Sequence, residues 1–268
     1  MNILARGTRG DDVAWLQALL SRSGFDAKPI DGDFGGQTER ALMACQADLG
    51  LPVTGAAGPD TRVAVGMNGP DPARDTVPVC ARLGVGEVVR MFPAATPRAN
   101  IEKHLPEILR AFAEAGLDDR DLVLMGLATV RAESEGFEPI DERVSRFNSS
   151  DPADRNRWFD LYAGRLGNRT REEAARYKGR GFVQLTGRDN YRTYGDRLGV
   201  ALLDAPERAN EPDLAARILA QFIADKRTRA KYAIFGGDLA TARKLVNGGS
   251  HGLDRFTDAF ETGMGLLA

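Results

Sequence analysis

The chain has 268 residues, of which 43% are hydrophobic and 28% are charged, proportions that are ordinary for a globular protein. Its 36 basic and 38 acidic side chains leave a net charge of -2, so no overall field favours nucleic acid or acidic lipid as a partner. This length exceeds that of one typical domain, so we expect two unequal domains that each bury a core.

The cysteines and histidines exclude several classes of site. Cys45 and Cys80 are the only cysteines, and we expect two free buried thiols, with one disulfide between them as the alternative. His104 and His251 lie in unrelated contexts, so the sequence predicts structural histidines and neither a metal site nor another cofactor. Zinc amidase and cysteine peptidase chemistry are disfavoured for the same reasons.

No segment of the sequence has the character of a targeting or membrane element. The first residues lack the apolar core of a secretory signal, and no apolar run approaches the roughly 18 residues that span a bilayer. We therefore expect synthesis in the cytoplasm without a signal peptide and no stable insertion into a membrane.

The N-terminal quarter of the chain contains an internal repeat. Apolar residues at helical spacing predict helices over 11–20, 38–49 and 61–65. Residues 30–42 and 53–65 align at an offset of 23, and each copy has glycines for tight turns followed by a residue that can cap the next helix. The matched positions are Gly32 with Gly55, Gly35 with Gly58, Thr38 with Thr61, and Ala41 with Ala64.

The first copy resembles the small three-helix peptidoglycan-binding module. It matches the signature of that module in Asp31-Gly32-Asp33-Phe34-Gly35-Gly36-Gln37-Thr38, in Ala41-Leu42 and in Cys45-Gln46, although Cys45 stands where an aromatic residue is usual. The resemblance implies a peptidoglycan-binding domain over 1–67, and the alternative is a helical bundle without a ligand. The module residues singled out by the signature are Asp31, Gly32, Phe34, Gly35 and Thr38.

A linker and a second, larger domain follow. Three prolines and a glycine among polar residues predict an extended linker over 68–78. The second domain, 79–268, is predicted to be mainly α, with one long irregular region over 145–182. Such long loops are uncommon in compact domains, so the length of this one indicates a functional role. Its predicted helices cover 80–91, 98–115, 118–133, 213–226 and 239–246.

The first candidate for chemistry in this domain is Glu133, in the last turn of the helix predicted over 118–133. The negative end of the helix dipole and partial burial both favour the protonated form, which a general acid must hold until it delivers its proton. The alternative is a solvated helix-end glutamate. Glu135 should face away from Glu133 and be exposed.

A glycosidase needs a second carboxylate across its cleft. Glu138, Asp141 and Glu142 lie near Pro139, on a loop that can fold back over the helix end, and spacing alone does not choose among them.

Two later stretches are rich in polar groups and glycine. Residues 178–191 combine glycines with donors, acceptors and a stacking face that would suit a sugar, and the alternative is a β-hairpin with a polar wet face. Residues 246–251 contain Asn247 and two glycines, which could also be only a helix cap and turn. The polar and aromatic side chains of the first stretch are Gln184, Thr186, Asn190 and Tyr191.

Taken in this order, the three stretches resemble those of the family 19 chitinase-like, lysozyme-fold endolysins. The resemblance covers nearly all of 90–268 and implies a lysozyme-like α-helical domain with a short β-hairpin or irregular loop region. The motifs that carry it are Ala132-Glu133-Ser134-Glu135-Gly136-Phe137, Gly179-Arg180-Gly181-Phe182-Val183-Gln184-Leu185-Thr186 and Val246-Asn247-Gly248-Gly249.

The resemblance also implies roles for individual residues. Glu133 matches the general acid, Glu142 the base, and Thr186 the hydroxyl that helps to hold the attacking water. Ala132 replaces the histidine that precedes the acid in the family. An inverting single displacement is implied, with the two carboxyl groups roughly 6.5–9.5 Å apart. The substrate-binding positions are Arg180, Gln184, Asn190, Tyr191 and Asn247.

The two resemblances together predict an endolysin that binds peptidoglycan glycan strands as a monomer. It would hydrolyse the β-1,4 bond between N-acetylmuramic acid and N-acetylglucosamine and lyse the host cell, reaching the wall after another protein has permeabilised the membrane. The alternatives are a lytic transglycosylase acting on the same bond, a chitinase, or a non-catalytic wall-binding or virion structural protein.

Overall fold

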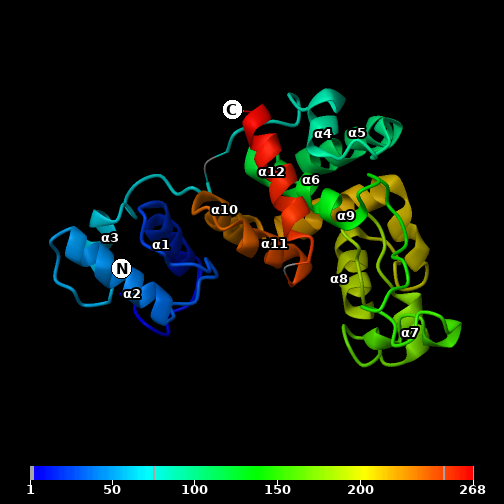
Figure 1. The fold of residues 1–268 in the computed structure, drawn as a ribbon, viewed down its shortest axis with the longest axis horizontal. Coiled ribbons are helices and arrows are strands. Elements are labelled where there is room, and N and C mark those ends of the chain that lie inside the picture. Colours follow the sequence, from blue (N-terminus) through cyan, green and yellow to red (C-terminus); the bar gives the residue numbers. More distant parts are fainter. Residues whose placement is uncertain (1–2, 75, 250, 268) are drawn as a thin grey trace. The chain divides into compact units, whose positions relative to one another are not determined.

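The computed structural model describes residues 3–74, 76–249 and 251–267 (Figure 1). It consists of helices joined by turns and irregular segments, and strand pairing in the described part is limited to three isolated antiparallel bridges. The prediction of a mainly α chain is therefore confirmed. No helix within these ranges is both long and apolar enough to cross a bilayer.

The chain divides into two compact units. Residues 225–253, which the sequence motifs assign to the second domain, pack in the same unit as the N-terminal residues. The functional domains 1–67 and 79–268, with their linker, stay a prediction, because sequence motifs define their boundaries whereas packing defines the two units. Unit 1 comprises Met1–Pro78, Asp119–Leu122 and Asp225–Leu253, and unit 2 comprises Val79–Asp118, Val123–Ala224 and Asp254–Ala268.

Unit 1 combines three N-terminal helices with two helices from late in the chain. Leu16, Phe34 and Leu42 are buried in one apolar cluster. Helix α1 packs against both α2 and α10, and the rings of Trp15 and Tyr232 stack with centroids 6.5 Å apart. The helices of this unit are α1 (Asp11–Arg22), α2 (Gly36–Asp48), α3 (Pro59–Ala64), α10 (Arg227–Phe235) and α11 (Leu239–Asn247).

A buried glutamine closes the loop of the first repeat. The Nε2 of Gln17 donates to Asp31 Oδ1, to the Asp33 carbonyl and to Thr38 Oγ1 over 3.0–3.2 Å. Its Oε1 accepts the N–H of Gly32 at 2.8 Å. The loop is therefore wrapped around one side-chain amide whose hydrogen-bonding capacity is used.

Gln46 closes the second loop in the same way. Its Nε2 donates to Thr54 Oγ1, the Ala56 carbonyl and Thr61 Oγ1 over 2.9–3.3 Å, and its Oε1 accepts the N–H of Gly55 at 3.0 Å. These four partners are offset by 23 residues from those of the first loop. The predicted repeat is therefore confirmed in three dimensions.

The helix caps of the two loops differ from the expectation. Helices α2 and α3 follow the N-cap residues Gly35 and Gly58, and neither makes a side-chain cap hydrogen bond. The threonines of the repeat, Thr38 and Thr61, accept hydrogen bonds from the buried glutamines instead.

Unit 2 is organised around α6. Every residue from 123 to 130 is buried, as expected for a helix that is apolar on all sides. Helix α5 packs against α4 and α9, and α9 packs against α8. Helices α6 (Arg120–Ser134) and α12 (Leu253–Leu266) begin in residues of unit 1 and continue through unit 2. The other helices of unit 2 are α4 (Val85–Met91), α5 (Arg98–Glu114), η1 (Arg155–Arg157), η2 (Asp160–Tyr162), α7 (Arg171–Arg176), α8 (Arg188–Leu198), η3 (Pro206–Asn210) and α9 (Pro212–Ala224).

Some boundaries differ from those predicted by periodicity. Helices α7, α8, α10 and α12 were not predicted; α8 is rich in polar residues, and its buried residues are Tyr191, Tyr194 and Gly195, so few large apolar side chains mark it in the sequence. Helix α4 begins at Val85 and not at residue 80. The reason is that Asp118 Oδ1 accepts the N–H groups of Val79 and Cys80 at 2.7 Å and holds them in a turn.

The cysteines and His104 take structural positions. Cys45 and Cys80 are free thiols, as predicted, with Cys45 buried and Cys80 half-buried. His104 is buried, and its ring meets Phe182 edge-on with centroids 5.7 Å apart. Burial lowers the pKa of His104 below its usual value.

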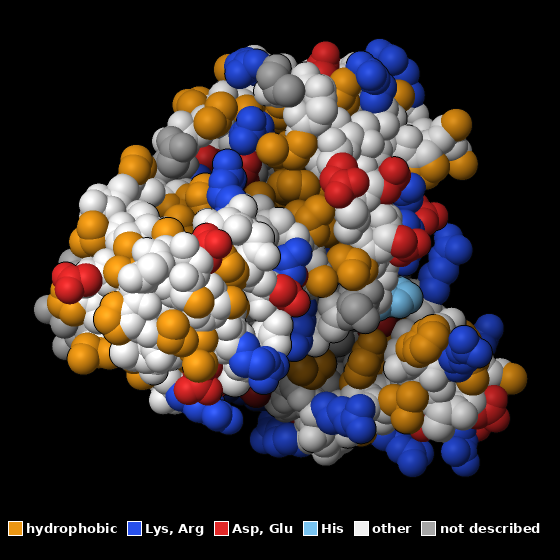
Figure 2. Space-filling view, turned by 60° about the vertical axis from the view of Figure 1, so that its left-hand side comes forward, with side chains coloured by type: hydrophobic (Ala, Val, Ile, Leu, Met, Phe, Trp, Pro, Cys, Tyr) orange, Lys and Arg blue, Asp and Glu red, His pale blue; other side chains and the backbone are white. Residues whose placement is uncertain are grey.

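Charges of both signs are scattered over the surface. On the face that Figure 2 shows, Lys and Arg side chains lie among Asp, Glu and uncharged side chains. Several exposed ion pairs contribute to this mixture, such as Arg98 with Glu102 and Arg208 with Glu211. Exposed pairs of this kind add little stability, but the mixture agrees with the net charge of -2.

Candidate functional site

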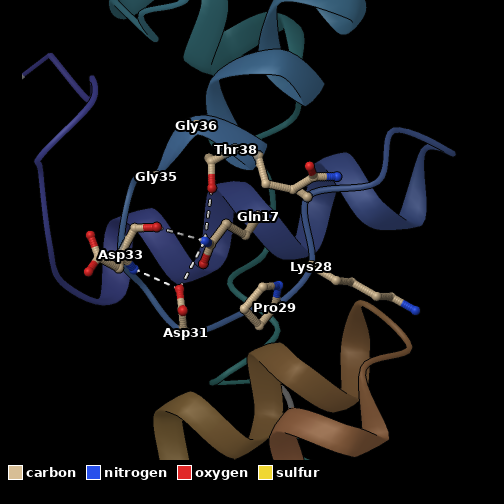
Figure 3. A pocket seen from close by; sticks show the side chains of 10 residues that line it. Gln17, Lys28, Pro29, Asp31, Asp33, Gly35, Gly36 and Thr38 are labelled. Atoms are coloured by element: carbon tan, nitrogen blue, oxygen red, sulfur yellow. Dashed lines mark hydrogen bonds between the residues drawn. The ribbon is translucent and has the colours of Figure 1, made fainter.

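Unit 1 carries a hollow of about 280 Å³ at the loop of the first repeat (Figure 3). Of the predicted module residues, Asp31, Gly35 and Thr38 line it, whereas Phe34 is buried in the core. Gly32 has a φ of 71°, a left-handed conformation that favours glycine. The lining consists of Gln17, Ala27, Lys28, Pro29, Asp31, Asp33, Gly35, Gly36, Gln37 and Thr38.

The wall of this hollow is polar and internally fixed. Figure 3 shows the Gln17 amide held between Asp31, Asp33 and Thr38, and Asp31 Oδ1 also accepts the N–H of Asp33 at 2.9 Å. The Lys28 side chain extends away from this group and donates to a backbone carbonyl at 2.9 Å. A loop that is already ordered loses little conformational freedom when a ligand binds.

In unit 2, Glu133 lies in the last turn of α6 and is half-buried. The chain turns sharply after it, because Phe137 has a left-handed φ of 54° and its ring packs edge-on against Phe92 with centroids 5.0 Å apart. Asn100 Nδ2 donates to the Gly136 carbonyl at 2.8 Å. These contacts fix the end of the helix and therefore the base of the Glu133 side chain.

Glu135 takes the outer position expected of it. Its side chain is 53% exposed and pairs with Arg255 at 3.0 Å and with Arg131 at 3.4 Å. An exposed ion pair contributes little, so Glu135 is a suitable comparison for Glu133 in experiments.

The carboxylate of Glu142 is held by three neutral donors. The N–H of Gly179 donates to Oε1 at 2.6 Å. Asn148 Nδ2 and the Tyr162 hydroxyl each donate to Oε2 at 3.0 Å. The backbone N–H of Glu142 also donates to the Gly179 carbonyl at 2.9 Å, so this carboxylate is fixed in both position and orientation.

Asp141, next to it, has a different environment. Lys178 Nζ lies 2.6 Å from Oδ2, Arg180 Nε lies 3.0 Å from Oδ1, and Asn210 Nδ2 donates to Oδ1 at 2.7 Å. Although burial acts in the opposite direction, these hydrogen bonds and charges hold the pKa of Asp141 below its usual value. Glu138, the remaining candidate from the sequence, is exposed.

The charges of both candidate carboxylates, Glu133 and Glu142, act on the hydroxyl of Tyr162. Burial raises the pKa of Tyr162, and the hydrogen-bonded Glu142 and the charge of Glu133 raise it further. Glu133 and Glu142 therefore lie within electrostatic range of the same phenol, although they are on different segments of the chain.

Gly179 is the point where three of the predicted residues meet. A Cβ atom at this position would lie 2.9 Å from Gln184 Oε1, 3.1 Å from Thr186 Oγ1 and 3.2 Å from Glu142 Cβ. A methyl group at this position would therefore press on all three side chains, which would have to shift by a few tenths of an ångström. The structure brings Glu142, Gln184 and Thr186 together around this residue.

Hydrogen bonds order the segment that contains these residues. It forms a tight turn closed by one bridge between Arg180 and Leu185, which is far shorter than a full β-hairpin. Gln184 has a left-handed φ of 52°, and its Nε2 donates to the Ile140 carbonyl at 2.9 Å, which ties this turn to the loop of Glu142. The Thr186 hydroxyl donates to the Gln184 carbonyl at 2.8 Å.

Three predicted substrate-binding residues make hydrogen bonds within the unit, and two of them, Tyr191 and Arg180, are buried. Asn190 Nδ2 donates to the Thr186 carbonyl at 2.8 Å. Tyr191 is fully buried and donates to the Lys178 carbonyl at 2.7 Å, so its ring has no exposed face for stacking. Arg180, only 7% exposed, donates to the Tyr191 hydroxyl at 2.9 Å.

Asn247 belongs to unit 1 and not to the unit of Glu133. It is the last residue of α11, and its Nδ2 donates to the His251 carbonyl at 3.1 Å. Gly248, the C-cap residue, has a left-handed φ of 72°, which agrees with the helix-cap interpretation of this stretch; Ser250 lies outside the described residues.

The sequence did not single out Tyr162 or Asn148, although both contact Glu142. Both lie in the irregular region 145–182, whose unusual length was the only signal of their importance. Over the described ranges, no group of His, Cys, Asp and Glu side chains is arranged as metal ligands would be.

Solved structures with some likeness to this chain include a variant of chitinase C, at 17% identity with a TM-score of 0.38, covering 68% of this chain and 76% of that one. Another is the Burkholderia AP3 phage endolysin, at 19% identity with a TM-score of 0.31, covering 98% of this chain and 99% of the endolysin.

Two curated relatives match about a fifth of the chain, and the chain covers less than a quarter of each of them. An N-acetylmuramoyl-L-alanine amidase CwlM of Mycobacterium tuberculosis is 52% identical over 52 residues, which are 19% of this chain and 13% of the relative. A spore cortex-lytic enzyme of Bacillus cereus is 43% identical over 60 residues, 22% of this chain and 23% of the relative. Residues 9–65 match the family model described as a putative peptidoglycan binding domain.

Proposed function

We propose that this chain is a modular peptidoglycan hydrolase of the endolysin type. Residues 1–67 would bind the bacterial wall, and 79–268 would cleave the β-1,4 bond between N-acetylmuramic acid and N-acetylglucosamine. The observation that carries the catalytic part is the carboxylate of Glu142, held by three neutral donors within electrostatic range of the same tyrosine as Glu133. The family match over residues 9–65 supports the binding part.

In the proposed reaction, Glu133 donates its proton to the departing sugar oxygen, and Glu142 removes a proton from the attacking water. Glu142 suits the role of base better than Asp141, because its partners are neutral donors while Asp141 is paired with Lys178 and Arg180. A carboxylate that two cations already neutralise has little affinity left for a proton. Attack by a water opposite the leaving group would invert the anomeric configuration.

The binding module favours peptidoglycan over chitin as the substrate. Tethering a wall-binding domain to the catalytic domain raises the effective concentration of the polymer at the cleft without any new contact there. The same arrangement would serve lysis of a host cell once the membrane no longer separates the protein from the wall.

A lytic transglycosylase remains the alternative on the same bond. That reaction uses one glutamate and no water, and it leaves a 1,6-anhydro end. A second carboxylate held as firmly as Glu142 supports hydrolysis, because a transglycosylase has no use for a base that activates water.

The test compares Glu133→Gln and Glu142→Gln with Glu135→Gln, an exposed glutamate two residues from the acid. Release of reducing ends from purified murein is followed, and the muropeptides are identified by mass spectrometry. Both site variants should lose activity by at least about 100-fold, while Glu135→Gln should match the wild type. If Glu142→Gln kept full activity and gave 1,6-anhydro products, the enzyme would be a lytic transglycosylase and not a hydrolase. If Glu133→Gln cleared murein as well as the wild type without releasing reducing ends, neither reaction would take place.

A further inference from the structure

Tyr162 projects from a short helical turn in the irregular loop and is itself firmly held. It closes η2, and its carbonyl accepts a hydrogen bond from Asn168 Nδ2 at 3.2 Å. Asn168 is 2% exposed, and its Oδ1 accepts the N–H of Arg188, the first residue of α8, at 3.0 Å. The tyrosine backbone is therefore anchored through a buried asparagine to a regular helix.

The hydrogen bonds to Glu142 distinguish its two oxygens. A carboxylate offers about four acceptor positions, two on each oxygen. Oε2 receives both Tyr162 and Asn148, at 3.0 Å each, so both of its positions are occupied. Oε1 receives only the N–H of Gly179, at 2.6 Å, among the donors of the described residues. One acceptor position on Oε1 is therefore left for a proton.

The hydroxyl of Thr186 lies near Gly179, the residue whose N–H donates to Oε1. A Cβ atom at Gly179 would be 3.1 Å from Thr186 Oγ1 and 3.2 Å from Glu142 Cβ, so both residues border the same small volume. Because the Thr186 hydroxyl donates to the Gln184 carbonyl at 2.8 Å, its oxygen is left as an acceptor. A water that donates one hydrogen to Thr186 and the other to Oε1 would point its own lone pair away from both.

We propose that Tyr162 is a positioning residue for the general base: by occupying Oε2 of Glu142, it directs removal of the water proton to Oε1, beside Thr186. This inference rests on the proposed hydrolysis. In the step, the water O–H bond breaks and its proton passes to Oε1, while the oxygen forms a bond to the anomeric carbon. The bond to the leaving sugar breaks, and that sugar's oxygen takes the proton of Glu133. Solvent then returns a proton to Glu133 and removes one from Glu142.

Tyr162→Phe tests this role, because it keeps the ring and removes only the donor. With murein as substrate, kcat should fall about 10- to 100-fold with little change in KM, since the base is misdirected while the sugar contacts remain.

Tyr177→Phe is the matched control. Its hydroxyl donates to the Leu203 carbonyl at 3.1 Å and does not contact Glu142, so its loss should leave both kcat and KM unchanged. The double variant Tyr162→Phe with Glu142→Gln tests whether Tyr162 acts through Glu142 or has a separate structural role. If Tyr162 acts only through Glu142, removing its hydroxyl should cause no further loss of activity once the base is gone.

The outcomes distinguish this inference from the proposed function. If Tyr162→Phe left kcat unchanged while Glu142→Gln was inactive, the role of Tyr162 would be overturned and the proposed hydrolase would stand. An equal further loss in the Glu142→Gln background would also overturn it, since the tyrosine would then act elsewhere. Full activity of Glu142→Gln alone would overturn the proposed function itself.

Discussion

The substitution Gly179→Ala tests whether Glu142, Gln184 and Thr186 form one site. The new methyl carbon would lie 2.9 Å, 3.1 Å and 3.2 Å from atoms of Gln184, Thr186 and Glu142, whereas ordinary contacts begin at 3.4 Å. Each neighbour must therefore give by a few tenths of an ångström. The backbone of Gly179 is not in the left-handed region, so space is the main obstacle to alanine.

The expected effect falls mainly on catalysis. Because a misplacement of about 1 Å can cost about 100-fold in rate, a shift of a few tenths of an ångström at the base should lower kcat by roughly 10-fold. The extra methyl group should also reduce the free energy of unfolding by about 1–3 kcal/mol. Reducing-end release from murein measures the first effect, and urea denaturation measures the second.

Gly86→Ala is the control for this experiment. Gly86 lies in α4, and a Cβ atom there would have no neighbour within 4 Å. Alanine should therefore stabilise the helix by up to about 1 kcal/mol and leave activity unchanged. If Gly179→Ala kept full turnover while folding normally, the convergence of the three side chains on Gly179 would have no part in catalysis.

Three further predictions concern buried groups. Lys231 and Asp119 form an ion pair at 2.9 Å, and both side chains are only 3% exposed. Lys231→Met would leave Asp119 as a buried charge without this cation, so the free energy of unfolding in urea denaturation should fall by about 3–5 kcal/mol. A change near zero would contradict this prediction. Burial and the hydrogen-bonded Asp118 raise the pKa of Cys80 to about 12, so iodoacetamide at pH 8 should label native protein far more slowly than unfolded protein, and equal rates would show that the thiol is accessible. Burial lowers the pKa of His104, so the unfolded chain binds more protons on acidification, and stability should fall as the pH drops below about 6.5. His104→Gln should flatten this part of a plot of stability against pH, and an unchanged slope would assign the effect to other groups.

Local pattern was sufficient for several features of this protein. The offset of 23 between two glycine-containing loops predicted a repeat, because each loop needs glycine and threonine at fixed places around a buried glutamine. The position of Glu133 in the last turn of a helix followed from apolar spacing and from the stop near Gly136. Mainly α structure followed from the same periodicity.

The choice among the other carboxylates was decided by tertiary structure. Glu142 is held by donors from residues 148, 162 and 179, which lie 6, 20 and 37 residues further along the chain and have no shared period. Asp141, its neighbour, points to two cations instead. No rule of spacing distinguishes these two adjacent acids, because the difference is made by long-range hydrogen bonds.

The sequence motif also did not predict which of its residues are buried. Tyr191 and Arg180 stand at positions that suit sugar binding by sequence, yet both are buried and hydrogen-bond to each other. Residues 225–253 pack with the N-terminal helices, since Tyr232 stacks on Trp15. By itself, the sequence determined which residue types occur and in what local geometry. Only the tertiary structure decided which of them face the same space, because side chains far apart in sequence meet through packing.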